Sequence, residues 1–62
     1  MFDEHTQVVL LSPLPSLGLD SGNAGVVVHI YGKGAAYEVE FVSSDGNTIG
    51  VATVEAANLR QA

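Results

Sequence analysis

The sequence predicts an all-β domain, built as a small, partly open barrel of about five antiparallel strands with a long loop between the first two. Two observations support this fold class. Short segments rich in β-branched residues recur along the chain, separated by turn residues, and no apolar pattern with the 3.6-residue helical period runs for three turns. Because the chain has 62 residues, we expect one domain with a thin core, spanning residues 1–62.

Four segments have the composition of strands, and a fifth short strand is expected at the end of the chain. The four are TQVVLL (6–11), GVVVHIY (25–31), AYEVEFV (36–42) and TIGVATV (48–54). The first stops before Pro13 and Pro15, which cannot continue a sheet ladder. The second is the run richest in β-branched residues.

The third segment alternates between apolar and polar side chains with a period of two. Tyr37, Val39 and Phe41 therefore point to one face. Glu38 and Glu40 point to the other face. This alternation predicts a half-buried strand whose outer face is acidic.

Short connectors predict antiparallel hairpins between the later strands. GKGA (32–35) and SSDGN (43–47) each join neighbouring strands over a few residues. The pair Asp45-Gly46 is a strong hairpin signal because glycine tolerates a positive φ. Five short strands in such a meander favour an SH3-like barrel of the KOW type.

The final part of the chain contains two weaker signals. Gly50 interrupts the fourth segment, which suggests a bulge or a close backbone approach. EAANL (55–59) is too short for a stable helix but suits a single helical turn, followed by a last short strand at RQA (60–62).

The long loop between the first two strands, residues 12–24, carries three apolar side chains of its own. Loops of this length without regular structure are uncommon in compact domains. Leu14, Leu17 and Leu19 can fold back over the open end of the barrel, or they can contact a partner. The sequence leaves both readings open.

The glycines of the loop do not fit a phosphate-binding motif. Dinucleotide and P-loop motifs place glycines before a long helix, whereas Gly18, Gly22 and Gly25 precede a strand. Lys33 is followed by glycine and alanine rather than serine or threonine. We therefore expect Gly22 and Gly25 to supply turn conformations that are closed to other residues.

The charge balance argues against nucleic acid and anionic membranes as partners. Lys33 and Arg60 are the only cations, against seven acids, for a formal net charge of −5. Phosphate backbones need clustered cations. The first residues lack the positive charge of a signal peptide and no run is long enough to span a bilayer, so a cytoplasmic location is expected.

Catalytic and metal-binding patterns are also weak, so we expect neither an enzyme nor a cofactor. Cysteine is absent, and the two imidazoles, His5 and His29, lack metal-ligand spacing. We expect His29 on the outer face of the second strand. Glu38 and Glu40 lie roughly 7 Å apart along their strand, a spacing compatible with acid–base catalysis, but a convex surface offers no cleft for a substrate.

Taken in order, the strands and loop resemble a family of small bacterial proteins, domain of unknown function 4926. The similarity rests on TQVVLL, LPSLGLDSGNAGVVV, YEVEFV and NLRQA, and covers nearly the whole chain. The resemblance implies an SH3-like barrel without an assigned activity. Fold alone does not supply a function.

We therefore expect a non-enzymatic module that binds an unidentified protein partner. The acidic face would steer a basic partner. Two alternatives stay open: an acidic, antitoxin-like inhibitor of a neighbouring gene product, and a homo-oligomer assembled through an edge strand such as residues 48–54. The candidate contact residues are Leu14, Leu17, Leu19, Tyr31, Tyr37, Glu38 and Glu40.

Overall fold

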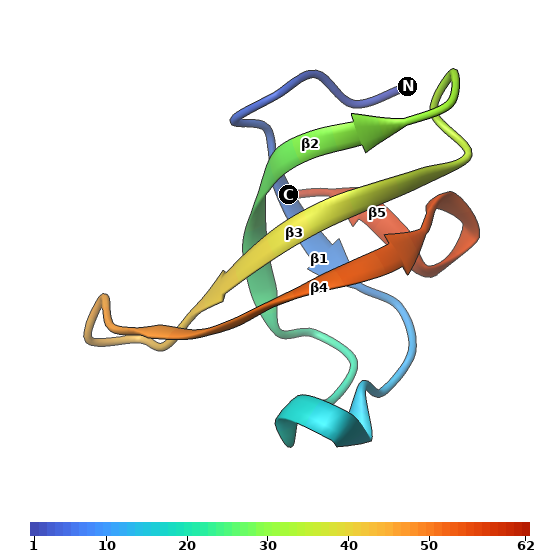
Figure 1. The fold of residues 1–62 in the computed structure, drawn as a ribbon. Helices are drawn as coiled ribbons and strands as arrows, with labels where there is room; N and C mark the ends of the chain where they lie inside the picture. Colours follow the sequence, from blue (N-terminus) through green and yellow to red (C-terminus); the bar gives the residue numbers. More distant parts are fainter.

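The computed structural model describes residues 1–62 and confirms the expected all-β fold (Figure 1). It contains no helix with the length and hydropathy needed to cross a membrane. The predicted strands are all present, with bounds that differ by a residue or two. In chain order the elements are β1 (Gln7–Leu10), the 3₁₀ turn η1 (Pro15–Leu17), β2 (Ala24–Tyr31), β3 (Ala36–Val42), β4 (Thr48–Glu55), the 3₁₀ turn η2 (Ala56–Asn58) and β5 (Leu59–Gln61).

All five strands form one antiparallel sheet in the order β4-β3-β2-β1-β5. The long β2 bends strongly (Figure 1). It pairs with β3 from Gly25 to Tyr31, and only its first residues, Ala24 to Val26, also pair with β1 on the other side. A register shift between Val27 and His29 marks a bulge near this bend. β4 and β5 remain at opposite edges of the sheet, so the barrel is partly open, as expected.

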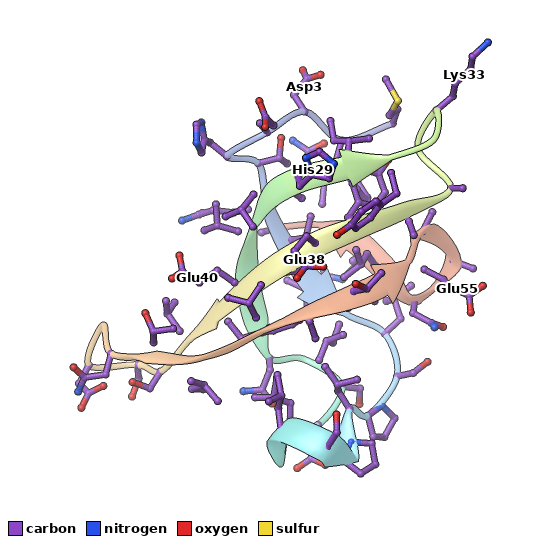
Figure 2. All side chains as sticks on the ribbon, viewed as in Figure 1. Asp3, His29, Lys33, Glu38, Glu40 and Glu55 are labelled. Carbon is purple, nitrogen blue, oxygen red and sulfur yellow. The ribbon has the colours of Figure 1, made fainter.

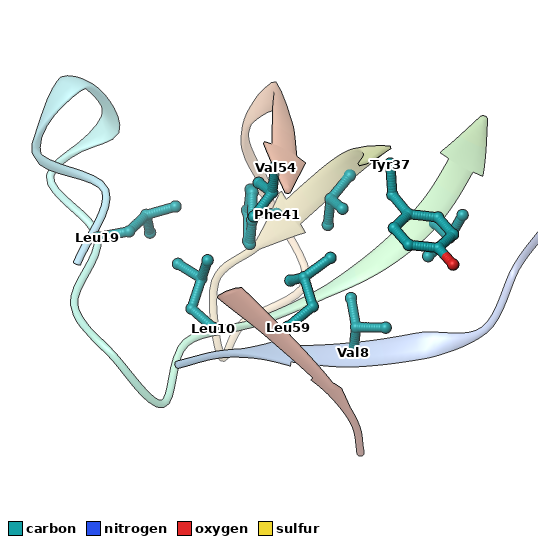
Figure 3. Close-up of a cluster of buried hydrophobic side chains, with 9 residues drawn as sticks. Val8, Leu10, Leu19, Tyr37, Phe41, Val54 and Leu59 are labelled. Atoms are coloured by element: carbon teal, nitrogen blue, oxygen red, sulfur yellow. The ribbon is translucent and has the colours of Figure 1, made fainter. Parts of the chain in front are cut away.

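The concave side of the bent sheet holds the core. The alternation predicted for β3 is confirmed, because Tyr37, Val39 and Phe41 are all buried. Figure 3 shows the side chains of this core converging from several strands and from the long loop. Its nine members are Val8, Leu10, Leu19, Val27, Tyr37, Val39, Phe41, Val54 and Leu59.

The long loop is ordered by its own hydrogen bonds. The amide N–H groups of Leu14 and Leu19 each donate to the other residue's carbonyl, at 2.8 and 3.1 Å, around the 3₁₀ turn η1. Gly22 has a φ of 96°, so it supplies a turn conformation, as predicted. The loop is therefore a small closed unit that presents Leu19 to the core.

The structure corrects the role expected for Gly25. This residue lies inside β2 and has no positive φ, so it does not provide a turn conformation. Its restriction is spatial. A Cβ atom at this position would stand 2.6 Å from Val39 Cγ1 and 2.8 Å from the carbonyl oxygen of Glu40. Glycine is required because β3 packs too closely for any side chain.

The β3–β4 hairpin turns where the Asp45-Gly46 pair predicted it, and Gly46 has a φ of 87°. Hydrogen bonds from the Ser43 hydroxyl and from the Asn47 backbone N–H hold the pKa of the exposed Asp45 carboxyl below its usual value. The turn is thus a local polar structure between the end of β3 and the start of β4.

Gly50 combines the two features predicted for it. The register of β3 against β4 shifts between Phe41 and Val42, one residue before Gly50 in β4. The side chain of Leu17 from the loop also packs directly on Gly50, since a Cβ there would lie 3.0 Å from Leu17 Cδ2. The glycine lets the loop cover the inner side of β4.

Candidate functional site

The convex side of the β2, β3 and β4 strands forms a solvent-facing surface that we call the outer face. Figure 2 shows Glu38 and Glu40 along β3, with His29 on the neighbouring strand. In the register of the sheet, Glu38 lies between His29 of β2 and Thr53 of β4. Three strands thus present their outward side chains side by side.

Hydroxyl groups fix both carboxylates of the outer face. The Thr53 hydroxyl donates to Glu38 Oε1 at 2.6 Å, and the Tyr31 hydroxyl donates to the same oxygen at 3.3 Å. On the second carboxylate, the Thr48 hydroxyl donates to Glu40 Oε2 at 3.2 Å. The two carboxylates are therefore held in place as hydrogen-bond acceptors, with other lone pairs free for a partner.

Apolar side chains surround these carboxylates and are exposed to solvent. Val28 is 37% exposed, Tyr31 41% and Val51 49%. Val51 lies opposite Glu40 in the sheet, and the ring of Tyr31 packs edge-on against that of His29, with centroids 4.8 Å apart. The outer face is consequently a mixed surface, apolar and acidic, rather than a purely solvated one.

The structure separates the candidate contact residues into two groups. Tyr31, Glu38 and Glu40 lie together on the outer face, and His29 lies there too, as predicted. Tyr37 is 1% exposed. Its hydroxyl accepts a hydrogen bond from the Phe2 N–H, at 3.0 Å. Tyr37 is a core residue and is not accessible to a partner, because it alternates inward along β3.

The three loop leucines also belong mainly to the core. Leu19 is 4% exposed, so it is a core residue and not a contact residue. Leu14 and Leu17 are half-buried and pack against the core. Of the two readings left open by the sequence, the structure supports the one in which the loop closes the open end of the barrel.

Several outer-face residues escaped the reasoning from sequence, notably Val28, Val51 and Thr53. A signal exists for Val28 in the β-branched run of β2. When consecutive residues of a strand are all β-branched, apolar side chains must lie on both faces. The exposed apolar side of β2 could have been inferred from this, whereas Gly50 and Ala52 interrupt the pattern of β4.

Replacing Leu17 with alanine is expected to lower the free energy of unfolding by about 1–2 kcal/mol, because a half-buried leucine loses only part of its packing. The matched variant is Leu11→Ala. Leu11 is 49% exposed, and its loss should cost less than about 0.5 kcal/mol. Urea denaturation of both variants checks this. Equal stabilities would place Leu17 outside the packed core.

The rest of the surface offers no further candidate site. No pocket is found on the surface, and no group of three or more His, Asp or Glu side chains is arranged to hold a metal ion. No buried side-chain polar atom lacks a hydrogen-bond partner.

Comparison with known proteins gives one match. The model of a family described as "Domain of unknown function (DUF4926)" matches residues 4–61, nearly the whole chain. No curated protein sequence and no solved structure matches the chain.

Proposed function

Since the chain belongs to the DUF4926 family, whose description assigns no activity, we propose that it is a non-enzymatic protein-interaction module that binds its partner through the outer face. The observation that carries the proposal is the presence of exposed apolar side chains and hydrogen-bonded carboxylates on one open sheet surface. The partner is a protein that presents basic and apolar side chains together.

Apolar contact supplies the affinity in this proposal. Val28, Tyr31 and Val51 are each more than a third exposed, so covering them removes apolar surface from water at about 25 cal/mol per Å². Tyrosine is also a residue type enriched at interfaces, because its ring is large and rigid while its hydroxyl tolerates water.

The carboxylates supply steering and orientation. With a formal net charge of −5, the chain attracts a basic partner during the diffusional encounter. Glu38 and Glu40 are already positioned by hydroxyl donors, so less side-chain freedom is lost when a lysine or arginine binds. Exposed ion pairs are weak individually. Their role is therefore mainly in the association rate and in specificity.

The test is a pull-down from host cells, followed by affinity measurements with the captured protein. The double variant Val28→Ser/Val51→Ser should weaken binding at least tenfold, because it removes apolar contact without adding charge. The matched control is Leu11→Ser, which changes a side chain that follows β1 and is as exposed as that of Val51. This control should bind within twofold of the parent chain.

Neutralising both carboxylates, as Glu38→Gln/Glu40→Gln, should slow association and reduce its dependence on salt. If the Leu11 variant and the Val28/Val51 variant lose affinity equally, the outer face is not the contact surface. Capture of no protein, together with growth of particle size at rising concentration, would instead favour the homo-oligomer.

A further inference from the structure

The free edge of β4 has the properties of a docking site for an additional strand. β4 is eight residues long and pairs on one side only, with β3. Native edge strands are commonly protected by proline, by lysine or by an inward-pointing charge. β4 contains neither proline nor lysine, and its one charged residue is Glu55. The bulge beside Gly50 protects only the first part of the strand.

The hydrogen-bond pattern identifies which backbone groups of β4 are free. The Ala56 N–H donates to the Ala35 carbonyl at 3.1 Å. Hydrogen-bonded and non-hydrogen-bonded pairs alternate along an antiparallel ladder. The pairs Glu55–Ala36 and Thr53–Glu38 are therefore non-hydrogen-bonded. Thr53 directs its N–H and C=O groups away from β3, and by the same alternation Val51 does so too. Glu55 offers only its N–H, because its carbonyl lies at the N-cap of η2 and accepts the first hydrogen bond of that turn.

We propose that this edge accepts an extended segment of the protein partner as a sixth strand, with basic side chains on the outer face and apolar side chains on the inner one. The inference rests on the proposed function and names the binding mode. Main-chain hydrogen bonds to Val51, Thr53 and Glu55 would provide register-specific affinity, and alternate side chains would provide specificity.

Charge selects the chemistry of the occupant. A residue of the sixth strand opposite Glu55 is its direct cross-strand neighbour, where opposite charges stabilise and like charges destabilise. A residue opposite Thr53 lies two strand spacings from Glu38, about 10 Å. If that residue is a lysine or arginine, its long side chain extends over the small Thr53 and meets the carboxylate of Glu38, which extends from the other side. Basic residues at alternate positions therefore match the outer face.

The same charges oppose a second copy of this chain as the occupant. Antiparallel pairing of two β4 strands would join two outer faces into one continuous surface. Each copy contributes Glu38, Glu40 and Glu55 to that surface and carries a formal net charge of −5. Like-charge juxtaposition reduces the stability of such a pairing.

The experiment uses the full chain and a blocked heptapeptide of alternating lysine and valine, observed by two-dimensional amide NMR. Binding should be saturable and should slow hydrogen exchange of the Val51, Thr53 and Glu55 amides in the unmodified protein. The variant Thr53→Pro should weaken binding at least tenfold. Proline is tolerated at an edge position whose N–H faces solvent, so β3 pairing is kept. Thr53→Val is the reference for this loss, because it removes the same hydroxyl and its hydrogen bond to Glu38 but keeps the N–H; Thr53→Pro should bind at least tenfold more weakly than Thr53→Val.

Three outcomes would overturn strand addition. Equal binding by Thr53→Pro and Thr53→Val would show that the peptide lies on the outer face without pairing, and the proposed function would survive. Equal binding of a glutamate–valine peptide would remove the charge selection. Concentration-dependent dimerisation that Thr53→Pro abolishes would make a second copy the occupant. Failure of the proposed function itself is recognised separately, by unchanged partner binding in Val28→Ser/Val51→Ser.

Discussion

Gly25→Ala is expected to destabilise the fold by about 3 kcal/mol, near the upper end for overpacking. The new Cβ would stand within 3 Å of Val39 Cγ1, of the Glu40 carbonyl oxygen and of Phe41 Cδ1. One of these contacts is backbone, so the strands themselves must move apart. Elsewhere in a strand the same change is favourable by roughly 0.5–1 kcal/mol, because glycine loses more chain entropy on folding. Whether Gly25→Ala lowers or raises the free energy of unfolding therefore tests the close approach of β3 to Gly25.

For a domain of this size, a loss of about 3 kcal/mol lowers Tm by roughly 12–24 °C. Thermal denaturation measures it directly. In the double variant Gly25→Ala/Val39→Ala, the closest contact, with Val39 Cγ1, disappears, while those with the Glu40 carbonyl oxygen and Phe41 Cδ1 remain. The double variant should therefore lose less stability than the sum of the two single variants. A Gly25→Ala variant as stable as the parent chain would contradict the packing of β2 on β3.

Phe41→Ala is expected to be the most damaging large-to-small change in the chain. The side chain is fully buried at the centre of the core, between β2 and β4. Truncating a buried phenylalanine costs about 3–5 kcal/mol, through lost burial and the remaining cavity. A domain of 62 residues has a total stability of roughly 3–9 kcal/mol. A large fraction of the variant should be unfolded at 37 °C.

Urea denaturation monitored by circular dichroism checks this result, with Glu40→Ala as the neighbouring control. Glu40 precedes Phe41 in β3 but points to the outer face, so its loss should cost less than about 1 kcal/mol. The conservative variant Phe41→Leu should lose less than half as much stability as Phe41→Ala. If Phe41→Ala costs no more than Glu40→Ala, the assignment of inner and outer faces is wrong.

Gly25→Ala and Phe41→Ala are not suited to measuring partner binding. A binding surface on the outer face depends on the curvature of β2 and β3, and the inner residues set that curvature. Partner binding should therefore be measured only on variants that remain folded, such as Val28→Ser/Val51→Ser. Partial unfolding would disturb the edge of β4 most, because the free backbone groups of β4 are positioned by pairing with β3 alone.

Local patterns were sufficient to place most of the secondary structure. The alternation of residues 36–42 predicted both the bounds of β3 and its buried face, since a strand presents successive side chains on opposite sides. The Asp45-Gly46 pair placed the hairpin, because its backbone conformation is a local property. Proline placed the end of the first strand before residue 13. These features depend on nearest neighbours in the chain.

Tertiary structure alone decided the roles of Leu19 and Gly25, and the partner of the Tyr37 hydroxyl. Each depends on atoms far away in the sequence: the loop reaches the core, Gly25 meets β3, and the hydroxyl of Tyr37, which the alternation had placed inward, accepts from the Phe2 N–H. The composition of the outer face has the same origin, because strand pairing places Val51 and Thr53 beside the glutamates of β3. Periodicity tells which residues share a face of one strand. Only the register between strands tells which faces meet, and therefore where a partner can bind.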